Sequence, residues 1–403
     1  MQRAPHVSPT TEGLSSSIFQ TLRKRAQGAR AKGGRVFALD VGDTYREPPE
    51  SARAETLLSA THPLVHAYAP PHGEPCLLDA IERRLEARSP PGHAPEREAI
   101  QIVSGATAGL SAACQTLLDP GEEILIPTPC WPLIPGIARS RGVIVVQAPV
   151  MTRLREPGFD LEAALASYIT PRTAALYLNT PHNPTGAILS VEDLDAVARV
   201  AERHDLWILA DEVYEDLWFE TPPPPAPWQR DDMRARTIST HSVSKAYGMA
   251  GARVGWTHGP VDAIRALRAV TTQQMYCAPR PMQVLASRAL TYGEPWLAEA
   301  RALNAVAARR CADAFGQCGQ AGQSLQGVPA SGSFLFFDAA PFFRAGEDIE
   351  GFLSRCLDAG VLLTPGIACG RDFTTWARAC FTSVSPAHLD EALALIQPVL
   401  KSR

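Results

Sequence analysis

Short apolar runs alternate with amphipathic stretches through the middle of the chain. The stretch 191–204 (VEDLDAVARVAERH), for example, repeats its apolar positions with the period of a helix. Strands that are apolar throughout and alternate with helices are typical of a mostly parallel sheet with helices on both faces. We therefore predict an α/β fold with a large central sheet. Its strands are expected at residues 99–103, 122–127, 143–149, 173–179, 206–212, 236–242 and 252–258.

The spacing of the apolar runs changes after about residue 275, where a long helical region is followed by further runs and a closing helix. This pattern predicts a second, smaller α/β lobe. Its strands are expected at 333–339, 361–366 and 376–382, with a helix near 349–359. We divide the chain into an N-terminal arm with part of the small domain at 1–48, a large domain at 49–280 and a small C-terminal domain at 281–403.

Two segments of the chain are expected to lie outside these layers. Residues 1–35 are polar and mixed, and we expect an arm followed by one helix from about Ile18 to Ala31. The proline-rich stretch 221–228 (TPPPPAPW) suits neither a helix nor a central strand, because proline has no backbone N–H to donate. A spacer loop at the surface is a better interpretation of this stretch than a proline-rich ligand for another protein.

The composition is that of an ordinary globular protein of 403 residues, with 45% apolar and 20% charged residues. A formal net charge of −4 disfavours a nucleic-acid surface, which needs a basic field. The N-terminus lacks the apolar region of a signal peptide, and no apolar run approaches the roughly 20 residues that span a bilayer. The nine cysteines are scattered without a CxxC pair, so we expect no metal site, no disulfide framework and a cytoplasmic setting.

Lysine is rare in this chain, and Lys245 is the only one of the four lysines that lies far from a terminus. It follows an apolar strand in the segment 239–256 (STHSVSKAYGMAGARVGW), which also contains Ser242 and Arg253. A lysine amine whose pKa is lowered by its surroundings can form an imine with an aldehyde cofactor. The hydroxyl of Ser242 and the guanidinium of Arg253 would suit a phosphate group. A surface lysine in a loop is the alternative.

Two further strands end in polar side chains. Asp211 ends an apolar strand, and ligands of open α/β sheets lie at the carboxyl ends of their strands. A carboxylate there could keep a pyridine nitrogen protonated, and Tyr214 could donate to the phenolic oxygen of the same ring. Asn179 and Asn183 follow another strand in the pattern Asn-x-x-x-Asn-Pro-Thr-Gly, and Asn183 could also bond that oxygen. Capping by Asp211 and simple turn formation by Asn-Pro are the alternatives.

A turn of small residues opens a helix in the stretch 102–117 (IVSGATAGLSAACQTL). The backbone N–H groups of Gly105, Ala106 and Thr107 would form an anion site there, because a helix N-terminus carries partial positive charge. Small residues allow a phosphate to approach closely. Trp131, set between prolines after the next strand, could stack on a flat aromatic ring, although a tryptophan packed in the core is the usual alternative.

Arg378 lies inside the otherwise apolar strand of 376–382 (WARACFT). A buried guanidinium is costly without a partner, so this arginine predicts a carboxylate that binds it through two hydrogen bonds. That carboxylate belongs either to a substrate or to an internal Asp or Glu. Arg280 and Arg371 have no assigned role, and we expect them at the surface or in ion pairs.

Taken together and in this order, these segments resemble the class I/II aminotransferases of pyridoxal 5′-phosphate (PLP) fold type I, from about Leu39 to the last helix. The Asn-Pro-Thr-Gly, Asp-Glu-Val-Tyr and Ser-x-Ser-Lys…Arg motifs are jointly specific for this family. The resemblance makes Lys245 the residue that forms a Schiff base with PLP and Asp211 the partner of the pyridine nitrogen. It further implies that Asn183 and Tyr214 contact the ring oxygen and that Trp131 stacks on the ring. Arg378 would bind the substrate carboxylate, and Asn179 would orient that arginine. The phosphate would be bound by Ser242, Arg253, Gly105, Ala106 and Thr107.

Two more residues take their interpretation from the resemblance alone. Tyr68, in 67–81 (AYAPPHGEPCLLDAI), resembles a tyrosine that reaches the phosphate of the neighbouring subunit, which implies a homodimer with shared active sites. Gly42, in 39–49 (LDVGDTYREPP), resembles the loop near the substrate carboxylate. The chain departs from the family at Ala252, where a bulky aromatic residue is frequent, and the substrate therefore stays open.

The resemblance implies an aminotransferase that moves an amino group between an L-amino acid and a 2-oxo acid by ping-pong chemistry. Lys245, once displaced from PLP by the substrate amine, would remove the α-proton as a general base and return it to the cofactor. Two alternatives stay open at this point. The same carbanion can lead to β- or γ-elimination, replacement, oxidation or cyclisation. A non-catalytic PLP-binding regulator is the more remote alternative, because the residues before Leu39 are too few for a DNA-binding module.

Overall fold

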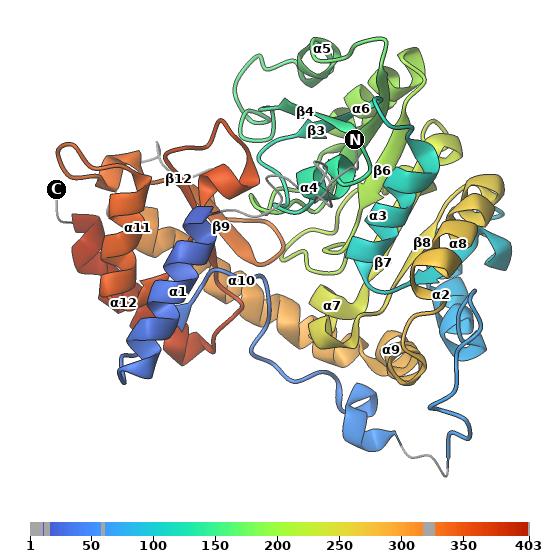
Figure 1. Cartoon of the computed structure of the whole chain (residues 1–403), viewed down its shortest axis with the longest axis horizontal. Helices are drawn as coiled ribbons and strands as arrows, with labels where there is room; N and C mark the ends of the chain where they lie inside the picture. Colours follow the sequence, from blue (N-terminus) through green and yellow to red (C-terminus); the bar gives the residue numbers. More distant parts are fainter. Residues whose placement is uncertain (1–10, 12–16, 58–60, 317–326, 402–403) are drawn as a thin grey trace, which may run out of the picture.

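The structure, a computed structural model, describes residues 11, 17–57, 61–316 and 327–401. Apart from residue 11, the arm expected ahead of Ser17 lies outside the described residues. The helix expected from about Ile18 to Ala31 is present as α1, Ser17–Ala31. The described residues form a larger and a smaller lobe, which lie side by side (Figure 1).

A seven-stranded sheet forms the centre of the larger lobe, in the order β2-β8-β7-β6-β5-β3-β4. Its strands are parallel except β8, which runs antiparallel to both of its neighbours, β2 and β7. Each of the seven predicted runs contains one of these strands, so the mostly parallel α/β sheet is confirmed. The strands are β2 Ile100–Val103, β3 Glu123–Pro127, β4 Ile144–Ala148, β5 Thr173–Asn179, β6 Trp207–Asp211, β7 Thr237–Ser242 and β8 Gly255–His258.

Helices cover both faces of this sheet (Figure 1). On one face α3 packs against α4 and α8, and on the other α5 packs against α6. Leu176 and Leu178 of β5 face α6, whereas Ala175 and Tyr177 face α3, because successive side chains of a strand point to opposite sides. The helices are α2 Pro75–Arg88, α3 Ala106–Leu117, α4 Ile134–Arg139, α5 Leu161–Ala166, α6 Val191–Arg203, α7 Val243–Ala246 and α8 Val261–Met275.

The smaller lobe consists of short strands covered by helices (Figure 1). Three strands pair antiparallel in the order β11-β12-β9, and β1 pairs parallel with β10. The run expected as one strand at 361–366 is divided between these two sheets, because β10 ends at Leu362 and β11 begins at Thr364. The elements are β1 Phe37–Ala38, β9 Phe334–Asp338, β10 Val361–Leu362, β11 Thr364–Pro365, β12 Trp376–Cys380, α11 Ile349–Asp358 and α12 Pro386–Lys401.

Two consecutive helices, α9 Arg280–Tyr292 and α10 Glu294–Gly316, connect the lobes. α9 packs against α2 of the larger lobe. α10 begins in the same core, where Leu297 is buried, and continues into the smaller lobe, where Ala308 and Phe315 are buried. We therefore propose a domain boundary within α10 rather than at residue 280. The pairing of β1 with β10 supports the assignment of the segment before residue 48 in part to the small domain.

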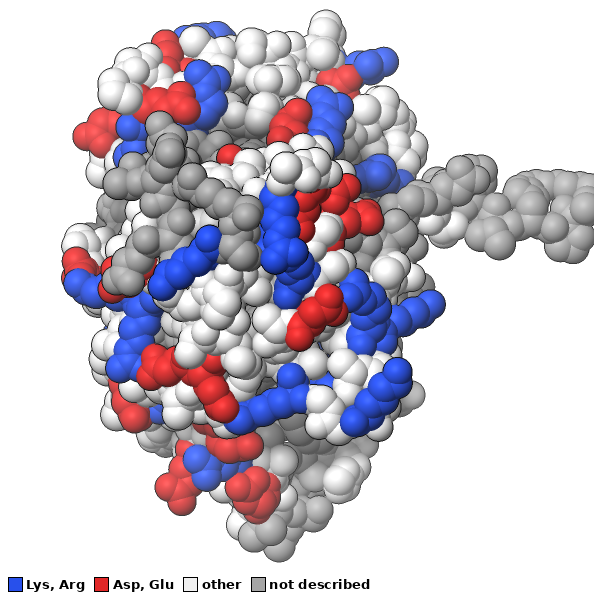
Figure 2. Space-filling view, turned by 90° about the vertical axis from the view of Figure 1, so that its left-hand side faces the viewer, with Lys and Arg blue, Asp and Glu red and all other residues white. Residues whose placement is uncertain are grey.

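The surface of the molecule carries charges of both signs. On the face formed by the smaller lobe, lysine and arginine side chains are interspersed with aspartate and glutamate (Figure 2). Arg35 pairs with Glu391, and Arg310 pairs with Asp390. The proline-rich stretch has no helix or strand up to Ala226 and ends in a 3₁₀ turn, Pro227–Gln229. Within the described ranges, every helix is too short or too polar to cross a bilayer.

Candidate active site

The carboxyl ends of β5, β6 and β7 meet at one edge of the central sheet. Asn179, the last residue of β5, pairs in register with Asp211, the last residue of β6, and Ser242 ends β7. An open cavity of about 120 Å³ lies at this edge, where open α/β sheets bind their ligands. Its lining residues are Ala106, Thr107, Trp131, Asn183, Asp211, Val213, Tyr214, Ser242, Ser244, Lys245, Ala250 and Arg253.

Asp211 is a buried carboxyl group at the wall of this cavity, with 3% of its surface exposed. The hydroxyl of Tyr177 donates a hydrogen bond of 2.7 Å to its Oδ2 atom, and the backbone N–H of Val213 lies 3.4 Å from Oδ1. Burial raises the pKa of Asp211 to about 6, because the carboxylate loses its hydration, while the hydrogen bond from Tyr177 acts in the opposite direction. A cationic ligand in the cavity would therefore favour the ionised form of Asp211.

Lys245 lies on α7, the single helical turn that follows β7. Ser242 caps this turn through its side chain, which fixes the direction in which the chain leaves the sheet. The Nζ atom of Lys245 donates a hydrogen bond of 2.5 Å to the carbonyl oxygen of Gly42. Burial lowers the pKa of Lys245, because the ammonium form is poorly solvated there, and the charge of Asp43 opposes this effect. Lys245 is thus a half-buried amine that gives up its proton more readily than a surface lysine.

A second part of the cavity combines donors that suit an anion. The first N–H groups of α3, from Ala106 onward, have no carbonyl partner within the helix. The guanidinium of Arg253 lies against the same turn, with Nη2 3.4 Å from the carbonyl oxygen of Ser104 and Nη1 3.5 Å from the hydroxyl of Ser244. A Cβ atom at Gly105 would lie 2.4 Å from Nη2 of Arg253, so only glycine lets the guanidinium approach the turn.

Three side chains between these groups are placed to contact a flat ligand. Trp131 is half-buried and lines the cavity. Asn183 is buried, and its Oδ1 atom accepts a hydrogen bond from Arg378, which leaves its Nδ2 atom as a donor. Tyr214 is buried and packs edge-on against Phe334, with the ring centroids 6.4 Å apart. The cavity therefore offers an aromatic face and two hydrogen-bonding side chains in addition to its charged groups.

Arg378 reaches this region from β12 of the smaller lobe and is only 6% exposed. Its Nη1 atom donates to Oδ1 of Asn183 at 3.0 Å, and Nη2 donates to the carbonyl oxygen of Asp40 at 3.1 Å. Its Nε atom has no hydrogen-bond partner among the described residues, and the ring of Phe334 covers the guanidinium at 4.1 Å. The carboxylate of Asp40 binds Arg23 instead. Arg378 is thus a buried cation with a free donor, as a site for an external carboxylate requires.

Asn179 acts on Arg378 only through Asn183. Its Nδ2 atom donates to the carbonyl oxygen of Asp211 at 2.7 Å, and its Oδ1 atom accepts from the backbone N–H of Asn183 at the same distance. Asn179 therefore joins the ends of β5 and β6 and fixes the loop that carries Asn183. Asn183 in turn accepts a hydrogen bond from Arg378, so the orientation of Arg378 by Asn179 stays a prediction, with Asn183 as the link between them.

Besides Arg378, Asn179 and Gly105, the predicted residues outside the cavity lining are Tyr68 and Gly42. Gly42 contributes its backbone carbonyl to Lys245, and a Cβ atom at this position would lie 2.4 Å from the ring of Phe334. Tyr68 is 81% exposed and packs edge-on against Tyr276, with the ring centroids 5.0 Å apart. Within one chain, Tyr68 therefore belongs to the outer surface of the molecule.

The comparison with known families decides the identity. The sequence profile described as "Aminotransferase class I and II" matches residues 35–396. This chain belongs to that family. An arginine–pyruvate transaminase of Pseudomonas aeruginosa is 34% identical over 356 residues, which cover 87% of this chain and 86% of the relative. An aspartate/prephenate aminotransferase of Thermus thermophilus is 32% identical over 402 residues and 98% of both chains.

Solved structures of aminotransferases share the fold. The aspartate aminotransferase from Thermus thermophilus with maleate superimposes with a TM-score of 0.85 at 27% identity, over 98% of this chain and all of the other. The N-succinyldiaminopimelate aminotransferase from Mycobacterium tuberculosis gives a TM-score of 0.86 at 26% identity over the same share of both chains. The protein is therefore an aminotransferase of PLP fold type I, and its substrates are amino acids and 2-oxo acids. The names of these relatives differ in substrate, so kinship defines the reaction and leaves the amino acid open.

Three side chains of this aminotransferase site are missing from the sequence-based expectations: Tyr177 on Asp211, Phe334 on Arg378, and Ser244 beside Arg253. Two of them have a signal in the sequence, since Ser244 is the second serine of the Ser-x-Ser-Lys motif. Tyr177 lies two residues before Asn179 and so on the same face of its strand, where a buried hydroxyl needs a partner. Phe334 has no such signal, because its contact joins strands that are distant in the sequence.

Proposed function

We propose that this aminotransferase uses PLP held at Lys245 and transfers amino groups between an L-amino acid and a 2-oxo acid in a ping-pong reaction. One observation carries the proposal. A half-buried amine of lowered pKa, a buried carboxyl group and an anion cradle all line a single cavity at the carboxyl edge of the sheet. This combination suits an aldehyde cofactor that has a basic ring nitrogen and a phosphate group.

The donor set of the cavity fits each part of PLP. Arg253 and the first turn of α3 offer N–H donors for the phosphate, and Gly105 keeps these two groups close together. Asp211 offers an acceptor for a protonated ring nitrogen, and Trp131 offers an aromatic face. When bound, PLP supplies an aldehyde that bonds to an amine and a ring that takes up electrons from the α-carbon of the substrate.

Asp211 holds the proton on the ring nitrogen in this proposal. Burial makes an unpaired Asp211 carboxylate unfavourable, so a cationic N–H partner at its oxygen is strongly preferred. The hydrogen bond from Tyr177 fixes the carboxyl group in place before the ligand arrives. Because the carboxyl group is preorganised, its charge need not be rearranged during the reaction.

Lys245 serves as the amine that holds the cofactor and, once released, as the general base. Its lowered pKa increases the share of neutral amine that can accept the α-proton of the substrate. The carbonyl oxygen of Gly42 lies 2.5 Å from Nζ and orients the amine. Lys245 can therefore remove the proton from the α-carbon of the substrate and return it to the cofactor.

Arg378 binds the α-carboxylate of the substrate. The guanidinium is held on two sides, by Asn183 and by the carbonyl oxygen of Asp40, so its free donor points in a fixed direction. A fixed guanidinium binds a carboxylate at a lower entropic cost than a mobile one. Because Asn183 also lines the cofactor cavity, the carboxylate and the ring would be held next to each other.

A homodimer with shared sites and a cytoplasmic setting complete the proposal. Tyr68 and Tyr276 form an exposed aromatic pair, which a monomer has no reason to keep in water. A partner subunit would cover this pair and receive the phenol of Tyr68 at its phosphate. All cysteines in the described ranges carry free thiols, in keeping with a reducing compartment.

The proposal is tested by half-reactions of the purified holoenzyme with a panel of L-amino acids. An accepted amino acid alone should convert the absorbance of the bound cofactor and release one equivalent of 2-oxo acid per site. A 2-oxo acid added afterwards should restore the original spectrum. Lys245→Ala should abolish both steps, whereas Lys32→Ala, at an exposed lysine of the arm, should leave them unchanged.

Two results would contradict the proposal. Near-normal turnover by the Lys245→Ala protein would remove the lysine from the chemistry. Continuous release of ammonia without a 2-oxo acid acceptor would instead support elimination, the alternative outcome of the same carbanion.

A further inference from the structure

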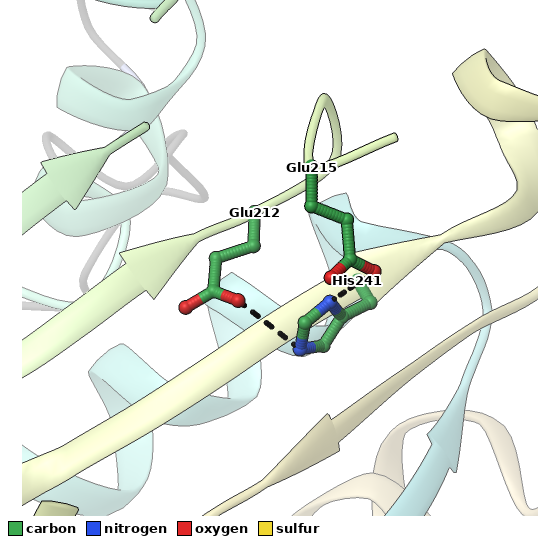
Figure 3. Close-up of side chains that lie close together, drawn as sticks. All are labelled: Glu212, Glu215 and His241. Atoms are coloured by element: carbon green, nitrogen blue, oxygen red, sulfur yellow. Dashed lines mark hydrogen bonds and ion pairs between the residues drawn. The ribbon is translucent and has the colours of Figure 1, made fainter. Parts of the chain in front are cut away.

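A buried ionic cluster lies behind the active site. Glu212 and Glu215, in the loop after β6, and His241, in β7, have side-chain atoms within 4.8 Å of one another (Figure 3). Thr240 faces α3, because a Cβ atom on Gly109 of that helix would meet its Cγ2 at 3.0 Å. Since side chains alternate along a strand, His241 points to the opposite face of the sheet.

This cluster is arranged as a chain of hydrogen bonds and not as a metal site. The Nδ1 atom of His241 lies 2.9 Å from Glu215, and its Nε2 atom lies 3.6 Å from Glu212, so the two carboxylates face opposite edges of the ring (Figure 3). A metal ion binds one nitrogen of an imidazole and would lose one of these carboxylates. Both oxygens of Glu215 also accept hydrogen bonds from Arg84 and Arg88.

The hydrogen-bond pattern places a proton on Nδ1 of His241, and the Nε2 atoms of His241 and His258 share one further proton. Burial acts to raise the pKa of Glu215, but His241, Arg84 and Arg88 outweigh it and hold that pKa well below its usual range. Glu215 therefore only accepts, and Nδ1 of His241 donates to it. On the other side, Nε2 of His241 lies 3.0 Å from Nε2 of His258.

The two histidines differ in their affinity for the proton between them. Burial acts to lower the pKa of His241, but the Glu215 carboxylate outweighs it and the pKa is raised. Burial and the charge of His241 both lower the pKa of His258, which faces no carboxylate at hydrogen-bonding distance in the described part of the chain. His241 is thus the charged ring of the pair and donates to a neutral His258.

The charged ring lies next to the strand partner of Asp211. Asp211 pairs in register with Thr240 across β6 and β7, and the backbone N–H of Glu212 donates to the carbonyl oxygen of Thr240 at 2.9 Å. We propose that His241 is a charged positioning residue that favours the ionised form of Asp211 from the opposite face of the sheet. The use of that carboxylate rests on the proposed function, whereas the coupling between the two side chains does not.

The carboxylates around His241 do not cancel its charge, so this charge can act on Asp211. Glu215 and Asp216 pair with Arg84 and Arg88 of α2, so these two carboxylates face three cations when His241 is counted. Burial raises the pKa of Glu212 to about 7, so this carboxyl is only partly charged at neutral pH. The charge of His241 accordingly lowers the pKa of Asp211, against the effect of burial. The charge of a buried cation acts across the sheet because the protein interior screens it only weakly.

The first test uses the cofactor-free protein with aspartate labelled at the carboxyl carbon, and NMR of the signal that disappears in Asp211→Asn. His241→Gln should raise the midpoint of the Asp211 titration by about half a pH unit, a threefold change in proton affinity. His258→Gln is the matched control, because it removes a neutral ring from the same face. It should leave the midpoint within about a tenth of a unit of the unmodified protein.

A second measurement needs no substitution to fold. Among the ten histidines, labelled in the ring, one should keep the imidazolium shift at pH values where the others have become neutral. The inference is overturned if every buried histidine shows a neutral shift at pH 7, or if His241→Gln leaves the Asp211 midpoint unchanged. Equal shifts in His241→Gln and His258→Gln would also overturn it, because they would report a general loosening of the cluster.

The last arm adds PLP labelled at the ring nitrogen. In the unmodified protein its signal should be that of a protonated pyridine, and in His241→Gln the proton should move toward Asp211. If the unmodified protein binds no PLP, the proposed function fails while the coupling measured in the cofactor-free protein still stands. If PLP binds and its ring signal is the same in the unmodified protein and in His241→Gln, the role of His241 is contradicted and the proposed function is not.

Discussion

At the scale of single residues, the site consists of charged groups that the fold buries before any ligand binds. Asp211 and Arg378 each have neutral hydrogen-bond partners, Tyr177 for the first and Asn183 for the second. Neither forms an ion pair with any of the described residues. Such groups cost stability in the empty protein, and a ligand of opposite charge recovers that cost.

Asp211→Asn should therefore stabilise the cofactor-free protein in a pH-dependent way. The pKa of Asp211 is raised from 3.8 to about 6 on folding, so the folded state binds the proton more tightly than the unfolded state. Stability from this group is complete at low pH and is lost as the pH rises from about 4 to 6. Relative to the parent, the free energy of unfolding of the variant should rise by about 2–3 kcal/mol across that window. This difference should stay constant at higher pH. Urea unfolding at several pH values measures this difference. A difference that does not change between about pH 4 and 6 would contradict a buried Asp211 that titrates in this range.

Arg378→Gln should impair the binding of the substrate carboxylate and leave the cofactor in place. Loss of charge-assisted hydrogen bonds to the carboxylate should lower kcat/KM for the amino acid roughly 100-fold or more. The absorbance of the bound cofactor should not change. Arg371→Gln is the matched control, because that side chain is 74% exposed. Equal losses in both variants, or none in Arg378→Gln, would argue against the assignment.

At the scale of elements, the sequence predicts which segments reach the site better than it predicts their contacts. Asp211 and Ser242 could be placed because apolar strands end at them, and a parallel sheet gathers such ends at one edge. The helical turn that carries Lys245 could not be foreseen, because a cap and four residues give no periodic pattern. The pairing of Phe334 with Arg378 also gave no signal, since it depends on the packing of two distant segments.

The turn between β2 and α3 provides a prediction at this scale. Gly105→Ala should weaken PLP binding about tenfold, because its Cβ atom would displace the guanidinium of Arg253 from the phosphate cradle. Gly105 also has a φ of +76°, so the alanine costs roughly 1 kcal/mol of stability.

Gly121→Ala separates the two effects. Gly121 has a φ of +95° and no atom within 4 Å of an added Cβ, so this variant carries the backbone cost alone. Both proteins should melt at lower temperature, and only Gly105→Ala should bind PLP more weakly in an absorbance titration. Weaker binding in both would show that the cradle depends on general stability.

At the scale of the whole molecule, the site exists only where separate parts of the chain meet. Lys245 and Asp211 belong to the larger lobe, Arg378 comes from the smaller one, and Gly42 comes from the segment before both. Sequence patterns located each part, but the contacts between the lobes follow from how α9 and α10 join them. The exposed Tyr68 extends the argument to a second copy of the chain.

Hybrid dimers test that extension. If Tyr68 completes the partner's site, a dimer of one Lys245→Ala chain and one Tyr68→Ala chain has one doubly altered site and one intact site. Random mixing of the two inactive proteins should then restore about a quarter of the sites, measured as activity at a PLP concentration that leaves Tyr68→Ala empty. Mixtures as inactive as their components would contradict shared sites. So would a single-chain mass in sedimentation.

The account depends most on the attachment of the cofactor to one lysine, and the chain makes this measurable because it has only four lysines. Borohydride treatment of the holoenzyme, followed by peptide mass spectrometry, should leave the added phosphopyridoxyl mass on the peptide that contains Lys245. Label on Lys24, Lys32 or Lys401 in its place, or on no lysine at all, would contradict the account.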